Sequence, residues 1–383
     1  MIEMSDSTTF TLQQTLHKVN SVQEMLNSIH IEDLSINLPD GGTPKCAKNS
    51  WDFNQKYQNE LDDEHVTYHC CYRDVNNPLE NIGRPFRLQA KAAKIFDRYM
   101  KSKVVMSEEI MEDKHLIPQP VTAFSDNHYE EHLQQIESAL RVFGADAAKG
   151  YKAIPIIIYD LGMSEEIINY VKRNESFIYR KLNWEEFPEH VGTLYTYAWK
   201  SCIWTEVLSE FGSIMWFDTS IDFIVQDREQ IKKVAIKHAY NKHASFLYYV
   251  HSAGHSVSWA TNADMFTYLP SNIHMMNEAA NVTMGQANGV MIWNTIEMKN
   301  SIMKWGLLCA LTKYCIAPKT VWRKDDKVAK WCPKGSETKT YSYICHRYDQ
   351  SLFAILTRNF YQYNEDRYQV NDEDILGIPE RLG

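Results

Sequence analysis

The chain has 383 residues, with 40 basic and 49 acidic side chains, so its formal net charge is −9 and its pI is near 5.9. Because 44% of the residues are apolar, a chain of this length buries enough apolar surface to exclude disorder as a description of the whole. The acidic balance argues against nucleic acid or an anionic membrane as the main partner, and the sequence has no apolar run long enough for a membrane helix.

The first part of the chain is predicted to be an appendage. Residues 1–50 are polar and end in the turn-forming cluster Pro39–Pro44, which is typical of a stem or tail. Residues 51–115 are charged and mostly helical by pattern, and apolar residues recur at helical spacing from Phe86 to Val105. We therefore expect an N-terminal appendage, helical or disordered, before a single domain over residues 116–383.

From Pro120 onward, short apolar runs alternate with amphipathic stretches. Strands are predicted at Val121–Phe124, Ile154–Tyr159, Phe177–Tyr179, Ser213–Phe217, Phe246–Val250 and Gly289–Trp293. Helices are predicted around Ile136 and Ile168, over Leu194–Phe211 and over Ser301–Tyr314. This alternation predicts an α/β fold with a mainly parallel sheet, whose ligand site lies beyond the carboxyl ends of the strands.

The sequence lacks the glycine motifs of dinucleotide and P-loop folds and the G-x-S-x-G of esterases. A metal ion held by carboxylates is the commonest other way to bind phosphate. If the backbone stays extended after Phe217, then Asp218, Ser220 and Asp222 point to one side. Their oxygens suit Mg²⁺ or Mn²⁺, which would neutralise a diphosphate. The alternative is that Asp218 is a turn residue and that Ser220 and Asp222 are solvated.

The segment His346–Ser351 precedes an apolar stretch and is predicted to begin a helix. There, His346 would serve as a metal ligand, Arg347 as a cation for diphosphate and Asp349 as a general base. The alternative is a helix cap in which Asp349 or Ser351 accepts a backbone N–H, while His346 and Arg347 are solvated.

Residues His128–His132 fit the H-x-x-E-H pattern of a zinc peptidase, in which two histidines one helical turn apart hold Zn²⁺. A solvated helix face is the alternative. Four cysteines near the C-terminus show no zinc-finger spacing, so buried thiols or disulfides are expected instead: Cys309, Cys315, Cys332 and Cys345.

Five motifs occur in an order that resembles a known family: Val121–His128, Ile158–Gly162, Tyr197–Lys200, Trp216–Ser220 and His346–Ser351. That family is nematode-expanded, is known only as a domain of unknown function, and is similar in its pattern to nucleotide-sugar glycosyltransferases of the GT-A type. The resemblance covers about residues 117–362.

The resemblance implies one GT-A-like, Rossmann-like domain for a nucleotide diphosphate sugar, with an unknown acceptor. It implies that the nucleoside pocket is lined by Phe124, Ser125, Asn127 and Asp160. It further implies that Lys200 faces the diphosphate, that Asp218 and Ser220 stand where such enzymes keep an Asp-x-Asp pair, and that His346 and Asp349 close the site. Ser220 departs from that pair, and a hydroxyl is a weaker ligand for Mn²⁺ or Mg²⁺ than a carboxylate.

We therefore expect a glycosyltransferase, with a catalytically silent nucleotide- or sugar-binding protein on the same fold as the alternative and a zinc metallopeptidase as a third. Relatives of this type are usually type II membrane proteins of the secretory pathway, which implies the lumen of the Golgi or endoplasmic reticulum. The N-terminal residues MIEMSDSTTFTLQQ show neither an anchor nor a signal peptide, so a cytoplasmic location stays open.

Overall fold

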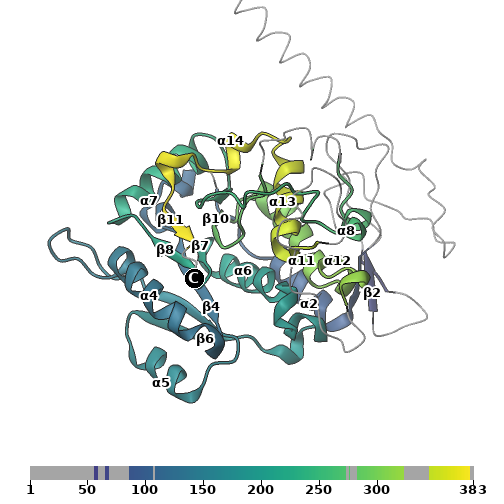
Figure 1. Ribbon diagram of the computed structural model, residues 1–383, viewed down its shortest axis with the longest axis horizontal. Coiled ribbons are helices and arrows are strands. Elements are labelled where there is room, and N and C mark those ends of the chain that lie inside the picture. Colours follow the sequence, from purple (N-terminus) through teal and green to yellow (C-terminus); the bar gives the residue numbers. More distant parts are fainter. Residues whose placement is uncertain are drawn as a thin grey trace, which may run out of the picture.

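The computed structural model describes residues 56–58, 65–68, 86–106, 108–272, 276, 283–322 and 345–379. At its centre lies a six-stranded sheet in the order β6-β5-β4-β7-β10-β9 (Figure 1). The strands are β4 (Gln119–Phe124), β5 (Ile156–Asp160), β6 (Phe177–Lys181), β7 (Ser213–Phe217), β9 (Phe246–Tyr248) and β10 (Gly289–Trp293). Strands β4 to β7 run parallel and β10 is antiparallel to both of its neighbours. The predicted mainly parallel α/β sheet is confirmed, and each predicted strand is present.

The order of the strands defines where a ligand crevice belongs. From β4 the chain moves outward through β5 and β6, then returns to place β7 against the other side of β4. Strand order therefore reverses between β4 and β7, and α/β sheets bind their ligands outside the carboxyl ends of the strands at such a point. The register pairs Val121 with Trp216, so Phe124 and Phe217 end their strands at the same edge.

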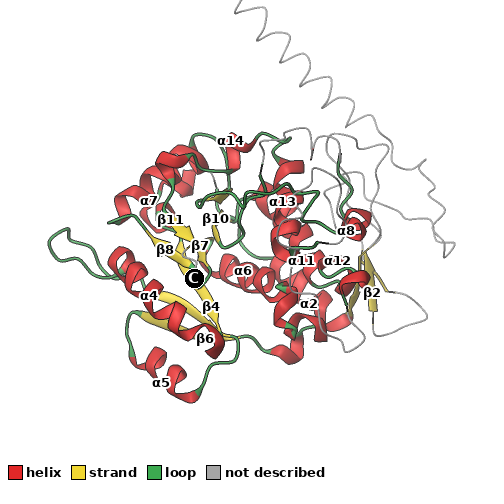
Figure 2. Ribbon diagram, in the orientation of Figure 1, coloured by secondary structure: helices red, strands yellow, loops and turns green. Residues whose placement is uncertain are grey.

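Helices cover both faces of the sheet (Figure 2). Along β5, Ile157 and Tyr159 belong to one buried cluster, while Ile156 and Ile158 belong to the other. This alternation is the period of two expected of a strand that is buried on both faces. One face carries α4 (Tyr129–Phe143), α5 (Glu165–Arg173) and α7 (Arg228–Val234); the other carries α2 (Ala90–Met100), α6 (Ala198–Phe211), α11 (Lys304–Ala310) and α13 (Tyr348–Phe360).

Shorter elements complete the described fold. They are the helices α3 (Asp113–Leu116), α8 (Ala263–Tyr268), α10 (Ile296–Met298), α12 (Lys313–Ile316) and α14 (Glu365–Tyr368), and π-helical segments at Ala235–Tyr240 and Lys299–Met303. The helix predicted over Ser301–Tyr314 is thus divided between a π segment, α11 and α12. No helix in the described ranges is both long and apolar enough to cross a membrane.

Helix α6 connects the outer strand β6 back to the centre of the sheet and is buried on nearly all sides. Its residues from Ala198 to Thr205 are all buried, which an apolar helix in the interior of a domain requires. It ends at Gly212, whose φ of 77° closes the helix as predicted. It begins four residues later than predicted, because Leu194–Thr196 forms a 3-10 turn and Tyr197 is left-handed.

The N-terminal region contains strands where the sequence predicted mostly helix. Strands β1 (Lys56–Gln58), β2 (His65–Tyr68) and β3 (Phe86–Gln89) form a small antiparallel sheet, and α2 follows β3 directly. Phe86 and Leu88 alternate with polar residues, a period of two that a single helical assignment overlooked. Both side chains are fully buried in the cluster that also contains α6.

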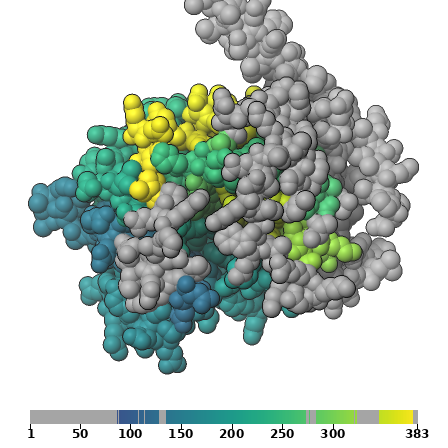
Figure 3. Space-filling model, in the orientation of Figure 1, coloured from purple at the N-terminus to yellow at the C-terminus, as the bar shows by residue number. Residues whose placement is uncertain are grey.

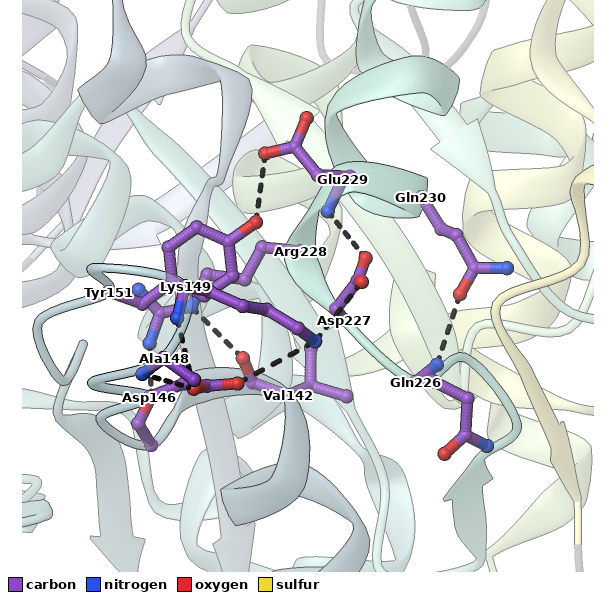
Figure 4. A network of polar contacts seen from close by, with 11 residues as sticks. Val142, Asp146, Ala148, Lys149, Tyr151, Gln226, Asp227, Arg228, Glu229 and Gln230 are labelled. Carbon is purple, nitrogen blue, oxygen red and sulfur yellow. Dashed lines mark hydrogen bonds and ion pairs between the residues drawn. The ribbon is translucent and has the colours of Figure 1, made fainter.

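A polar network joins the end of α4 to the start of α7 (Figure 4). The buried guanidinium of Arg228 donates hydrogen bonds to the carbonyls of Val142, Phe143, Gly144 and Lys152 at 2.5–3.0 Å. The last carbonyls of a helix have no partner within the helix and favour a nearby cation. Arg228 therefore closes α4, while Lys149 and Asp227, 3.2 Å apart, form a more exposed ion pair beside it.

A two-stranded sheet follows the end of β7. Strand β8 (Ile221–Phe223) pairs antiparallel with β11 (Gly377–Pro379), with Ile378 opposite Asp222. The segment from α14 to β11, yellow in Figure 3, is visible at the surface of the molecule. The C-terminal segment is thereby bonded to the chain that directly follows the turn at Asp218.

Candidate functional site

Three residues that are distant in the sequence meet at the carboxyl end of β7. The ammonium of Lys200, on α6, lies 3.0 Å from Oδ1 of Asp218 and 2.8 Å from Oδ2 of Asp349 on α13. It also donates to the carbonyl of Ala287 at 3.3 Å. Lys200 and Asp349 are almost fully buried, whereas the side chain of Asp218 is 28% exposed. The exposed part of the cluster is therefore Asp218.

Asp218 is held by its own strand. The indole nitrogen of Trp216 donates to Oδ1 of Asp218 at 2.6 Å, because residues two apart on a strand point to the same face. After Asp218 the backbone turns, with the amide of Ile221 donating to the carbonyl of Asp218 at 3.1 Å. The structure thus has the turn that was the alternative to an extended backbone at this point. Ser220 lies in the turn, and Asp222 lies beyond it on β8, 3.9 Å from Arg141.

Asp349 lies in the first turn of α13, where the helix dipole favours a carboxylate. Burial nonetheless raises the pKa of Asp349, and the nearby charge of Asp218 raises it further, against the opposing effect of Lys200. Burial alone would lower the pKa of Lys200, but the two carboxylates hold it well above its usual range. Lys200 is therefore a permanent cation, and Asp349 holds a proton more readily than an exposed carboxylate.

Aromatic rings surround the Lys200 ammonium. The ring centroids of Tyr197 and Trp216 lie 5.4 Å and 5.5 Å from Nζ, within the range of cation–π attraction. Tyr197 precedes α6 with a φ of 54° and Tyr348 begins α13 with a φ of 44°, and their rings are 6.2 Å apart. Left-handed backbone in bulky residues is strained and clusters at functional sites. Two such residues flank the Lys200–Asp349 pair.

His346 is bonded within the fold through both ring nitrogens. Its Nδ1 accepts from the backbone N–H of Asn262 at 3.2 Å, and its Nε2 lies 3.0 Å from the carbonyl of Ile316, to which it donates. Burial lowers the pKa of His346 to about 4, so the ring is neutral. In this arrangement neither nitrogen presents a lone pair to a metal ion.

The residues predicted for a nucleoside pocket lie at the ends of β4 and β5. Phe124 is buried in the core, Ser125 is half-buried and Asn127 is exposed. Asp160 is buried, and its carboxylate accepts from the amides of Gly162 and Met163 at 2.8 Å and 2.7 Å and from a tyrosine hydroxyl. Burial would raise the pKa of Asp160, but these hydrogen bonds hold it below its usual range. Asp160 therefore shapes the loop after β5.

Two other predicted features are only partly described. Arg347 precedes α13, and its backbone amide donates to the carbonyl of Ala260 at 3.0 Å. The H-x-x-E-H segment overlaps the start of α4, but the side chains of residues 128–134 lie outside the described residues. Among the described side chains, no group of three or more His, Cys, Asp or Glu residues is placed to hold a metal ion.

The sequence motifs contain the residues that position the cluster, but no positioning role was predicted for them. Trp216 was detectable, because it precedes Asp218 by two positions on a predicted strand. The left-handed Tyr197 and Tyr348 carry no such signal, since a tyrosine is rarely left-handed and only the packing of α6 and α13 imposes that conformation.

Comparisons with known proteins give a family match for part of the chain. Residues 60–205 match the family described as protein of unknown function (DUF1647). The matched segment includes Lys200 but ends before Asp218 and Asp349. No curated protein matches the chain.

Among solved structures, the chain is similar to the mannosyltransferase Ktr4p from S. cerevisiae in complex with GDP, with 10% identity and a TM-score of 0.28. The alignment covers 57% of this chain and 75% of that one. A likeness of this size does not indicate an activity.

Proposed function

We propose that this chain is a glycosyltransferase that moves a sugar from a nucleotide diphosphate donor to an acceptor hydroxyl. The observation that carries the proposal is the meeting of Asp218 and Asp349 on Lys200, at the strand ends where the order of the sheet reverses. A pair of carboxylates at such strand ends suits general acid–base work on a sugar.

The site divides the proposed reaction between its residues. The bond between the anomeric carbon and the diphosphate breaks, its electron pair leaves with the diphosphate, and the acceptor oxygen forms the new bond. Asp349, whose pKa is raised by burial, accepts the proton of the acceptor hydroxyl. The exposed edge of Asp218 accepts hydrogen bonds from sugar hydroxyls. Arg347 provides the cation for the diphosphate, and Ser125 and Asn127 contact the nucleoside.

The test measures binding and turnover separately. Calorimetric titration with UDP and GDP reports binding, and release of the nucleotide from sugar donors reports turnover. We expect Asp349→Asn to lower the release rate by about 10²–10⁴-fold while nucleotide affinity changes little. Asp222→Asn is the matched control. Asp222 also follows β7, but it lies on β8 and is paired with Arg141 rather than with Lys200. Failure of every nucleotide diphosphate to bind, with or without metal, would remove the proposal.

The second candidate is a catalytically silent nucleotide- or sugar-binding protein. It is favoured by Ser220, a hydroxyl in a turn, and by the burial of Asp349 against Lys200. It predicts that a nucleotide at about 100 times its Kd stabilises the fold by roughly 2.7 kcal/mol without any release of product. Donor turnover that disappears in Asp349→Asn would exclude this candidate.

The cysteines support a proposal about compartment. Cys309 and Cys315 form a disulfide, and Cys345 is also disulfide-bonded. Disulfides persist mainly in oxidising compartments, so they favour the lumen of the secretory pathway over the cytoplasm. Mass spectrometry of a non-reducing digest of the protein from its native cells tests this, since a free thiol at Cys309 would contradict it.

A further inference from the structure

We propose that Lys200 is the resident cation of this site and takes the place of a divalent metal ion between Asp218 and Asp349. The Lys200 ammonium lies 3.0 Å and 3.2 Å from the two oxygens of Asp218 and 2.8 Å from Oδ2 of Asp349. One buried cation thus satisfies two carboxylates that come from different elements. This inference concerns the metal alone and does not depend on sugar transfer.

A metal ion and this ammonium exclude each other. A Mg²⁺ ion shared by both carboxylates would lie about 2.0–2.1 Å from their oxygens, in the space that the ammonium occupies. Two cations at such close range also repel strongly in a buried site. Oδ1 of Asp218 also accepts a second hydrogen bond, because the indole nitrogen of Trp216 donates to it at 2.6 Å.

The other predicted metal ligands could not hold a metal ion in place of these two carboxylates. Ser220 lies in the turn after β7, and both ring nitrogens of His346 are bonded to the backbone of the protein. The predicted residues therefore do not fit a two-carboxylate metal centre while Lys200 is present. The charge of the cluster explains why a cation is needed, since the buried negative charge of Asp349 would otherwise lie beside the partly exposed one of Asp218 without compensation.

Removing the ammonium should reveal the metal site that it replaces. In Lys200→Met the aliphatic chain keeps its bulk, and the two carboxylates are left directed at one point. The experiment is calorimetric titration of the full chain with MnCl₂ alone, together with the melting temperature in Mn²⁺ and in EDTA. We expect Lys200→Met to bind one Mn²⁺ at least about tenfold more tightly than the wild type, with a melting temperature that rises in Mn²⁺.

Two variants serve as controls. Lys200→Met combined with Asp349→Asn removes one carboxylate and should lose the Mn²⁺ affinity. Lys299→Met removes another buried lysine, whose ammonium bonds the carbonyl of Ser102 and lies 5.8 Å from the Tyr99 ring. It should gain no Mn²⁺ affinity.

The wild type keeps the test decisive if Lys200→Met fails to fold. Wild-type protein that shows no Mn²⁺ binding up to millimolar concentration supports the proposal. Wild-type protein that binds one Mn²⁺, with loss of that binding in Asp218→Asn, overturns it, as does a folded Lys200→Met with no gain in affinity. Because no nucleotide is used, these outcomes are distinct from failure of the proposed transferase activity.

Discussion

Lys200 and Asp349 form a buried ion pair with 2.8 Å between Nζ and Oδ2, although one lies on α6 and the other at the start of α13. Burying two charges costs several kcal/mol per ion, and their mutual attraction offsets this only in good geometry. Here the geometry extends to Asp218, so one cation compensates two carboxylates. Removing one partner of this cluster should therefore lower the free energy of unfolding, because a buried charge is left without compensation.

Lys200→Met is expected to lower the free energy of unfolding by about 3–5 kcal/mol, because the buried carboxylate of Asp349 and the partly exposed carboxylate of Asp218 lose their shared cation. Asp349→Asn should cost less, since Lys200 keeps its contact with Asp218. Urea unfolding at neutral pH measures both. A larger loss in Asp349→Asn than in Lys200→Met would show that the cation does not hold the cluster together.

His346 predicts a specific dependence of stability on pH. Its pKa is lowered to about 4 in the fold, below the usual value near 6.5, so the unfolded chain takes up a proton first as the pH falls. Stability from this group is therefore present at neutral pH and is lost as the pH falls from about 6.5 toward 4. Between pH 7 and 5 we expect a loss of about 2 kcal/mol from His346.

The measurement compares urea unfolding of the wild type and of His346→Gln, which does not titrate in this range. Other groups contribute equally to both proteins, so the difference isolates His346. Equal losses between pH 7 and 5 in the two proteins would contradict a neutral, buried His346.

Arg228→Ala is expected to lower the free energy of unfolding by about 3 kcal/mol, because three backbone carbonyls at the end of α4 and that of Lys152 lose a charged donor. The neighbouring Lys149→Ala is the control. The side chain of Lys149 is 43% exposed, and an exposed ion pair contributes little to stability, so Lys149→Ala should cost much less than Arg228→Ala. Similar losses in the two variants would mean that Arg228 does not close the helix.

Much of the fold was predictable because buried strands carry a strong local signal. The strands β5 and β7 contain the unbroken apolar runs Ile156–Tyr159 and Ile214–Phe217, because both faces of the sheet are covered by helices. The strand β3 was missed because its four residues lie directly before α2, and Leu88 lies at helical spacing from Ala92 and Phe96, so the short alternation of Phe86 and Leu88 was read as part of the helix. The secondary structure of such short segments is determined by the residues that pack against them.

The membership of the central cluster was predictable, but its geometry was not. The family resemblance implied that Lys200, Asp218 and Asp349 lie in one site, and the structure brings these three together. The direct bonds between them depend on the turn after Asp218 and on the left-handed residue before Asp349. Neither feature follows from local residue preferences. The neutral, buried state of His346 could not be predicted from the sequence either, because its two hydrogen-bond partners, Asn262 and Ile316, are distant in the sequence.

Gly212 and Gly254 provide a matched pair for testing the packing at the end of α6. Both are left-handed, with φ of 77° and 76°. A Cβ at Gly212 would lie 2.6 Å from the Val105 side chain and 2.9 Å from the His115 ring, whereas nothing lies within 4 Å of a Cβ at Gly254. Gly254→Ala should therefore lower the free energy of unfolding by only about 1 kcal/mol, the cost of a left-handed backbone in alanine. Gly212→Ala should lower the free energy of unfolding by about 1–3 kcal/mol more than that, because the added methyl group overpacks the site. Urea unfolding of both variants gives the difference, and equal losses would show that Val105 and His115 do not pack against the end of α6.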